Sequence, residues 1–498
     1  MEKRNFSKLQ TLGILAIISL IGGFLLVLFG GAGVSPLYGD IQFGHNEFDA
    51  NFFLYLGYAY INGQKPYIQI FDHKGLYIFW IEGLGALMGG RIGMYIIMSI
   101  YMSINIFCYI LIFRELKFSK PLSYIYSFLI GLALMMFSAM GAHHSGELLN
   151  PFFSLMILFY VMAIERKEKK FFYLGSSLAG LAAGLSFISR PSEVSLPFAA
   201  VIFYFVYWLK YEKNLELLWN ALLAIFFFII PLSASFIEAI SRGFFEEMLK
   251  CVFLQSSSYL YNHSDLSRTI TRLLTAVLVL GSLLSLSFNK KKMKDEEFIF
   301  LVSLLSIDGL FQILVARYIN YWISYLPIVL LSLILSYSPK NVDKKATTIL
   351  SGVLSLEYVA AISLFVISAY VPNTPWKFLN DDLHTTTYIN EECKANLDKI
   401  EEKDPNHEKE IYLMDANAAA LVYMGRLSDC KYVSNSSWWS FDNPSINEYV
   451  LTYIQENKPF WIITSSEGYQ TDNPLHDYVK ENYKEIGKDY TYMYLELI

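Results

Sequence analysis

Charged side chains are scarce in this chain of 498 residues: Asp, Glu, Lys and Arg make up 17%, whereas apolar residues make up 54%. Soluble domains carry about 25% charged residues, so the composition favours a membrane protein over a soluble one. Only four cysteines are present, too few for a disulfide framework. The C-terminal part contains no Gly-rich phosphate-binding loop, so its sequence does not predict a nucleotide site there.

Positive charge is also unevenly distributed. From Val371 onward the chain has 11 Lys and Arg against 22 Asp and Glu, a net charge of −11. The preceding residues have 28 against 23, a net charge of +5. A basic membrane part with an acidic C-terminal part argues against nucleic acid as a partner.

Long apolar runs recur along the first three quarters of the chain. They have about 16 to 25 residues each, close to the ~20 that a helix needs to cross the bilayer core. We predict eleven transmembrane helices from them. These are residues 11–32, 92–113, 121–142, 149–164, 171–189, 194–209, 215–237, 270–288, 298–316, 322–337 and 347–370.

The connections between these runs predict the orientation. Every second one is short and rich in Lys and Arg: MEKRNFSK, FRELKFSK, ERKEKK, LKYEK, NKKKMKDEE and SPKNVDKK. Because positive loops stay in the cytoplasm, we expect a cytoplasmic N-terminus, with loops 33–91 and 238–268 outside. We also expect the first apolar run to be retained as a span, since it is too long for the apolar core of a signal peptide.

The C-terminal part is expected to fold as a small α/β domain outside the cytoplasm. Residues 410–415, 459–464 and 490–497 are strand-like, and 446–456 and 474–483 have apolar residues at helical spacing. The predicted fold class is therefore a polytopic helical membrane protein with an extracytoplasmic α/β domain. The predicted boundary divides a membrane domain, 1–371, from a soluble domain, 372–498. We leave open whether Cys393 and Cys430 pair.

The first outer loop holds the strongest candidates for a functional site. Its charged and titratable residues include Glu47, Asp49, Asp72, His73 and Lys74. They lie beside segments 51–60 and 76–88, which have the character of helices in the membrane interface. Charge beside an apolar surface is costly unless it is paired or used, which favours function. The alternative is that Asp49 and Asp72 only cap these helices.

The pattern of this loop resembles the GT-C glycosyltransferases. It has Asp49, then 63–67 (GQKPY), then 71–75 (FDHKG) at the start of the second interfacial helix. The branch it resembles contains the protein O-mannosyltransferases and the aminoarabinose transferases of lipid A. Looser similarity continues at 146–148 (GEL), at 189–191 (SRP) and in the long outer loop 242–261.

The resemblance implies transfer of a sugar from a polyprenyl-phosphate carrier to an acceptor hydroxyl on the outer membrane face. The family's catalytic acidic residue maps onto Asp49, with Glu47 as the competing candidate, and the lysine that contacts the carrier phosphate maps onto Lys74. A carboxylate can take the acceptor's proton, and a cation can stabilise the departing phosphate. With one base and one displacement, the anomeric configuration should invert.

Other residues are expected to support this site. Glu147 supports the site or caps its helix, while Arg190 and Arg242 contact phosphate or extend to lipid headgroups. Asp72, His73, Tyr55 and Arg317 are expected to line the site. Expected partners are a lipid-linked donor, a glycan or lipid-linked acceptor that belongs to cell-wall or surface polysaccharide, and membrane lipids. No cofactor is expected; a divalent cation is disfavoured, because the adjacent His143 and His144 point in different directions.

Three other functions would also use many apolar helices. A flippase for lipid-linked saccharides needs no long acidic outer loop and no folded outer domain. A polysaccharide polymerase usually lacks the folded C-terminal part. A membrane O-acyltransferase requires a buried histidine, whereas all eight histidines lie outside the predicted spans.

Overall fold

The computed structural model describes residues 2–31, 33–36, 48–136, 146–255, 266–315, 325–337, 391–434, 445–465, 474–489 and 491–498. The chain divides into two compact units. The first, here the bundle unit, comprises Met1–Gly31, Tyr95–Ile237 and Ser264–Phe365. The second, the loop–tail unit, comprises Ala32–Met94, Glu238–His263 and Val366–Ile498. The boundary predicted at residue 371 stays a prediction, since it lies outside the described residues.

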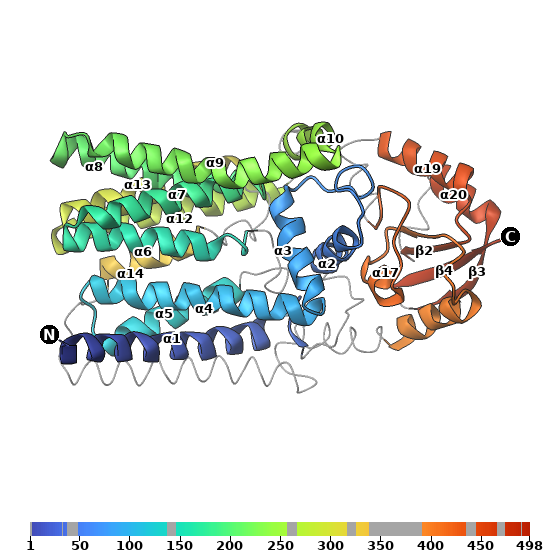
Figure 1. Ribbon diagram of the computed structural model, residues 1–498, viewed down its shortest axis with the longest axis horizontal. Helices are drawn as coiled ribbons and strands as arrows, with labels where there is room; N and C mark the ends of the chain where they lie inside the picture. The colour runs from blue at the N-terminus through green and yellow to red at the C-terminus, as the bar shows by residue number, and fades with distance from the viewer. Residues whose placement is uncertain are drawn as a thin grey trace. The chain divides into compact units, whose positions relative to one another are not determined.

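The bundle unit is built from apolar helices that run alongside one another (Figure 1). In order they are α1 (Glu2–Gly30), α4 (Arg91–Glu115), α5 (Lys120–Met136), α6 (Asn150–Arg166), α7 (Lys169–Phe187), η2 (Pro191–Val194), α8 (Ser195–Tyr207), η3 (Trp208–Glu212), α9 (Glu216–Arg242), α12 (Leu266–Asn289), η5 (Lys290–Lys292), α13 (Asp295–Val315) and α14 (Leu326–Tyr337). Helices occupy most of the described residues of the first ten predicted spans; the eleventh, 347–370, lies outside the described residues, and the count of eleven stays a prediction.

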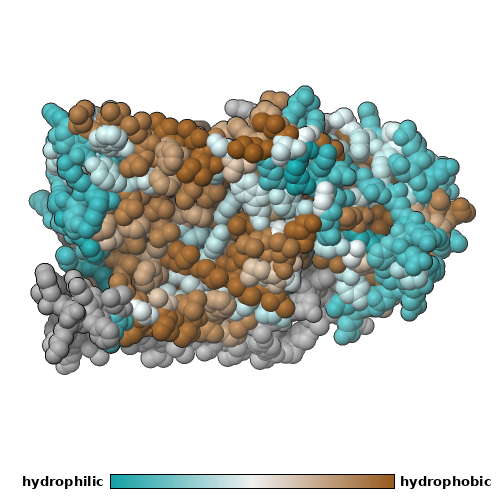
Figure 2. Space-filling model, viewed as in Figure 1, coloured by the Kyte–Doolittle hydropathy of each residue, from teal (hydrophilic) through white to brown (hydrophobic). Residues whose placement is uncertain are grey.

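Six helical segments of the described residues are long and apolar enough to cross a membrane. They are Gln10–Gly30, Arg91–Glu115, Pro191–Glu212, Glu216–Arg242, Arg272–Asn289 and Asp295–Leu314. In α9 only 17% of the most apolar stretch is buried inside the protein, and Figure 2 shows an apolar surface over the helices. Such a surface is suited to lipid, where every helix satisfies its own backbone hydrogen bonds.

Helices α7 and α9 approach each other closely because α7 presents glycines to α9. A Cβ added at Gly180 would collide with the backbone carbonyl of Ala224, and one added at Gly184 would collide with Pro231. Close contact between small residues and a facing backbone is typical of helices in membranes, where van der Waals packing drives association. The pair therefore depends on the absence of side chains at two positions of α7.

The basic connections gather at one end of the bundle unit. Ion pairs join them there: Arg166 with Glu115, Lys167 with Glu296, Lys169 with Glu216, Lys210 with Asp295 and Lys294 with Glu165. Figure 2 shows hydrophilic residues covering this end. Four of the six basic loops thus lie on the same side, as the sequence predicted. Which side of the membrane this is stays a prediction.

The loop–tail unit contains the outer-loop helices α2 (Phe48–Ile61), α3 (Leu76–Leu87), α10 (Phe245–Leu249) and η4 (Lys250–Gln255). Its C-terminal part begins with a helical stretch at 391–403. The elements that follow are β1 (Ile411–Met414), α17 (Ala419–Met424), α19 (Ser445–Asn457), β2 (Trp461–Ser465), α20 (Pro474–Asn482), β3 (Tyr483–Lys488) and β4 (Tyr492–Leu497).

The strands form one mixed sheet of order β1-β2-β4-β3. Strand β1 pairs parallel to β2, with Leu413 opposite Ile463, and β4 runs antiparallel to both of its neighbours. The three predicted strands and two predicted helices are all present. Strand β3 was not predicted, because in YKEIGK only Tyr483 is buried and the apolar alternation that marks a half-buried strand is missing.

Candidate functional site

Helices α2 and α3 pack closely and carry the candidate residues between them. Gly57 of α2 lies directly against the backbone of Glu82 in α3, so that any side chain at position 57 would collide with it. Most of α2 is buried, including Phe53 and Tyr55. The two helices form a fixed frame for segment 62–75, which connects them.

Tyr67 determines the path of this connecting segment. Its φ angle is +64°, in a region that costs a non-glycine residue on the order of 1–3 kcal/mol. The surrounding contacts enforce it: the Tyr67 amide donates to the carbonyl of Ile70 at 2.8 Å, and the hydroxyl donates to the carbonyl of Lys74 at 2.9 Å. Its ring lies 5.6 Å from that of Phe79. Tyr67 therefore fixes the backbone at Lys74.

Asp72 and Lys74 form a buried ion pair at the end of this segment. The carboxylate oxygen Oδ1 of Asp72 accepts from the backbone amide of Lys74 at 3.1 Å and from its Nζ at 3.3 Å. The imidazole Nδ1 of His73 lies 3.4 Å from the same oxygen. The N-cap residue of α3 is Gly75, so capping of α3 by Asp72 is ruled out. Asp72 instead positions Lys74.

Asp49 lies in the first turn of α2, where the helix dipole favours a carboxylate. The side chain is half-buried, and this burial raises the pKa of Asp49, with a further contribution from the charge of Asp72. The positive charge of Lys74 acts in the opposite direction. The raised pKa of this carboxyl lies closer to neutral pH, and a general base works best when its pKa is near the working pH.

Lys74 thus interacts with both carboxylates, and its ammonium also lies over an aromatic ring. Its Nζ lies 4.7 Å from the centroid of Phe53, one turn after Asp49 on α2, and its side chain is 15% exposed. A cation over an aromatic face gains about 0.5–2 kcal/mol. The structure therefore brings together Asp49, Asp72, His73 and Lys74, and adds Phe53 and Tyr67, which the sequence did not predict as site residues.

Arg242 lies in a different network of the same unit. Its guanidinium pairs with Glu238 at 3.0 Å and donates to the carbonyl of Gln64 at 3.0 Å. Glu238 also accepts from Tyr60 at 2.8 Å and from Trp80 at 2.7 Å. This network ties residues 238–242, the last turn of α9, which belongs to the loop–tail unit, to α2, α3 and the connecting segment. Contact of Arg242 with a donor phosphate stays a prediction.

Two further candidates lie in the bundle unit. Arg190 precedes η2 and pairs with the buried Glu193 at 3.3 Å. Glu147 is buried in the turn before α6. The N-cap residue of α6 is Leu149, so Glu147 is not its N-cap. Glu47, Arg317, His143 and His144 lie outside the described residues. Among the residues that the structure describes, no group of three or more potential metal ligands occurs.

Tyr55 does not face an open space. Its side chain is fully buried, and its hydroxyl accepts a hydrogen bond from the backbone amide of Ser428, in the C-terminal part, at 2.9 Å. Burial raises the pKa of this hydroxyl above its ordinary value, so it stays protonated. The residue joins α2 to the tail, and a direct role in lining a substrate site stays a prediction.

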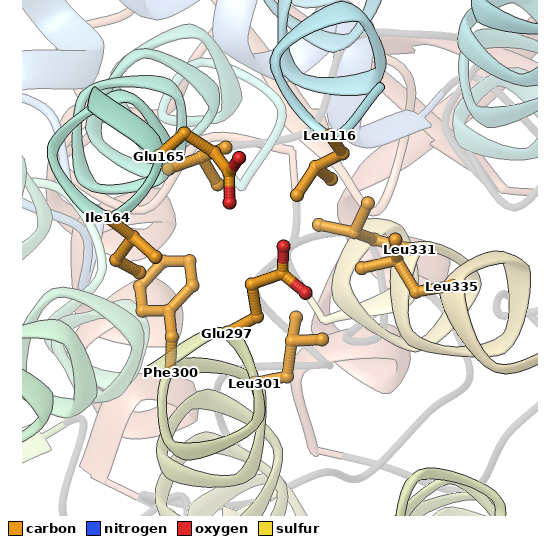
Figure 3. A pocket seen from close by; sticks show the side chains of 9 residues that line it. Leu116, Ile164, Glu165, Glu297, Phe300, Leu301, Leu331 and Leu335 are labelled. Atoms are coloured by element: carbon orange, nitrogen blue, oxygen red, sulfur yellow. The ribbon is translucent and has the colours of Figure 1, made fainter. Parts of the chain in front are cut away.

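A separate pocket of the bundle unit is lined by Leu116, Val161, Ile164, Glu165, Glu297, Phe300, Leu301, Leu331 and Leu335. In Figure 3 the carboxylates of Glu165 and Glu297 point into it. Lys294 binds both, through Nζ to Glu165 at 2.7 Å and through its amide to Glu297 at 3.1 Å. Glu165 lies near the C-terminus of α6, roughly 25 Å from its N-terminus. The pocket thus belongs to the end with the basic connections.

Comparison with known proteins identifies the fold. No protein-family model matches the sequence, and no curated protein matches it. Among solved structures, ArnT from Cupriavidus metallidurans bound to undecaprenyl phosphate aligns over 97% of both chains, with 9% identity and a TM-score of 0.61. The apo structure of the same protein aligns over 98% of both chains, with 10% identity and a TM-score of 0.58. ArnT is a lipid A aminoarabinose transferase of the GT-C type. The predicted resemblance to GT-C proteins is therefore confirmed for the fold, over nearly the whole chain.

Proposed function

We propose that this protein is a membrane glycosyltransferase that moves a sugar from a polyprenyl-phosphate carrier to an acceptor hydroxyl. The observation that carries the proposal is the cluster of Asp49, Asp72 and Lys74, held on a frame of buried helices beside the predicted membrane surface. The ArnT-like fold, seen in a protein that binds undecaprenyl phosphate, supports a lipid-linked donor.

In this reaction Asp49 takes the proton of the acceptor hydroxyl while the hydroxyl oxygen attacks C1 of the sugar. The bond between C1 and the phosphate oxygen breaks, and its electron pair leaves with polyprenyl phosphate. Lys74 stabilises the negative charge that develops on that oxygen, where a fixed cation contributes most. Attack opposite the leaving group inverts the configuration at C1. Asp72 keeps the ammonium of Lys74 in place and does not itself touch the substrate.

Transfer is tested in lipid vesicles that contain the purified protein. Polyprenyl-phosphate sugars labelled in the sugar, both hexoses and pentoses, are supplied with a membrane extract as the source of acceptors. The expected result is release of polyprenyl phosphate together with incorporation of label into the acceptor. Movement of intact donor across the bilayer without cleavage would instead establish the alternative, a flippase. Absence of cleavage with every donor would overturn the proposal.

The proposal also requires the loop–tail unit to face the exterior, with the basic connections in the cytoplasm. All four native cysteines are buried and unpaired, so an introduced cysteine can be labelled selectively. Glu246 of α10 has a side chain that is 84% exposed, and Lys291 of η5 is exposed too. In intact cells a membrane-impermeant maleimide should label the E246C variant and not K291C. After permeabilisation both should react.

The reverse labelling pattern would place the cluster on the cytoplasmic face, and the proposed donor chemistry would then fail.

A further inference from the structure

We propose that the C-terminal part positions the groups that carry out sugar transfer, because its residues 428–432 hold the segment that carries Asp72 and Lys74. We call these residues the tail strap. The inference rests on the proposed function and extends it: Tyr432 becomes a positioning residue for a reaction carried out by residues of the first loop.

The first contacts are between the tail strap and the connecting segment. The backbone amide of Phe71 donates to the carbonyl of Lys431 at 2.9 Å. The ring of Phe71 lies 4.9 Å from the ring of Tyr432. At the start of the segment, the side-chain amide of Gln64 donates to the carbonyl of Ser428 at 2.8 Å. Phe71 directly precedes Asp72, so these contacts fix the position from which Asp72 holds Lys74.

The tail strap also contacts the helix that carries Asp49. The amide of Ser428 donates to the hydroxyl of Tyr55, six residues after Asp49 in α2. Three residues before the strap, a Cβ added at Gly425 would lie 3.9 Å from the hydroxyl of Tyr58, also in α2. A third attachment joins Lys431 to Glu247 of α10 at 3.4 Å. The strap therefore reaches both pieces of chain that supply the proposed base and the proposed cation.

The tail strap can keep Phe71 and Asp72 in place because other residues of the C-terminal part hold the strap itself. The hydroxyl of Tyr412 in β1 donates to the carbonyl of Tyr432 at 3.0 Å. Just before the strap, the buried Arg426 pairs with Glu401 at 2.6 Å and with Asp404 at 3.0 Å. A continuous series of contacts thus leads from the sheet through the strap to Phe71 and Asp72. Small displacements of catalytic groups are costly: about 1 Å can lower the rate roughly 100-fold.

The test replaces Tyr432 by Leu, which removes the ring that lies against Phe71. We expect kcat for transfer to fall about 10-fold, with KM for the donor nearly unchanged, because Lys74 is less well placed when the bond breaks. The acid limb of the pH–kcat profile should also move to higher pH, since a displaced Lys74 opposes the raised pKa of Asp49 less. The variant Y432F keeps the ring and should restore both properties.

A second variant approaches the same contacts from the other side. Gln64→Leu removes the donor to Ser428 and should reproduce the lower kcat and the shifted acid limb. The control is Tyr483→Leu in the edge strand β3, where the buried Tyr483 donates from its hydroxyl to the carbonyl of Pro459 at 2.8 Å. This variant perturbs the tail and should keep the wild-type kcat and pH profile per folded molecule.

Wild-type kcat and acid limb in both Y432L and Q64L would overturn the inference while leaving the proposed function intact. The same holds if Y483L shows the same losses, because a general weakening of the tail would then explain them. Failure of the proposed function is distinguishable, because the wild-type protein itself would not release polyprenyl phosphate.

Discussion

The D49N variant is expected to transfer sugar about 10²–10⁴-fold more slowly than the wild type, the usual contribution of a general base. Asparagine fills nearly the same volume and cannot accept the proton of the acceptor hydroxyl. KM for the donor should change little, because Asp49 acts on the acceptor during bond formation. The measurement is release of polyprenyl phosphate under single-turnover conditions in vesicles.

The control for D49N is the variant D477N. Asp477 also lies in the first turn of a helix, α20, and it is exposed. Its replacement removes a comparable interaction with a helix dipole and leaves the site untouched, so wild-type turnover is expected. Equal turnover by D49N and the wild type would show that Asp49 is not the general base, and Glu47 would be the next residue to replace.

Replacing Lys74 by Met is expected to lower kcat about 10²–10³-fold, as for loss of one group that stabilises developing negative charge. A second effect, on the pH dependence of the rate, distinguishes the loss of the Lys74 charge from a general disturbance of the fold. Lys74 opposes the rise in the pKa of Asp49, so without its charge that pKa rises further. Because the base works only when deprotonated, the rate of K74M should begin to fall at a higher pH on acidification.

The arginine variant K74R keeps the positive charge and should retain an acid limb close to that of the wild type. Lys65 supplies the matched control, since it lies in the same connecting segment with an exposed side chain. The variant K65M should resemble the wild type in rate and in pH profile. A K74M profile with the wild-type acid limb would show that Lys74 does not act on Asp49.

The elements of this fold were largely predictable because they follow from local patterns. Long apolar runs give the helices of the bundle unit, and clustered lysines give the common side of four connections. The missed strand β3 shows the limit: an edge strand with one buried side chain carries almost no periodic signal. Its register depends on β4, which follows it in the chain.

The candidate site was predictable only in its charged residues. Asp49, Asp72, His73 and Lys74 lie within 26 positions of one another, and the structure does bring them together. The capping alternative for Asp72 could be excluded only from the actual start of α3 at Leu76. The bond from Gln64 to Ser428 joins residues 364 positions apart. Such a pair leaves no pattern in one sequence, and so the contribution of the tail was not predicted.

The absence of side chains where α7 meets α9 has a practical consequence for handling the protein. In lipid there is no hydrophobic driving force between apolar helices, so this contact depends on van der Waals packing of complementary surfaces. A methyl group at Gly184 would push against Pro231 in any solvent, whereas exchange of lipid for detergent leaves the interlocking surfaces unchanged. Helices α7 and α9 should therefore stay together during extraction, and an alanine at position 184 should separate them even in the native membrane.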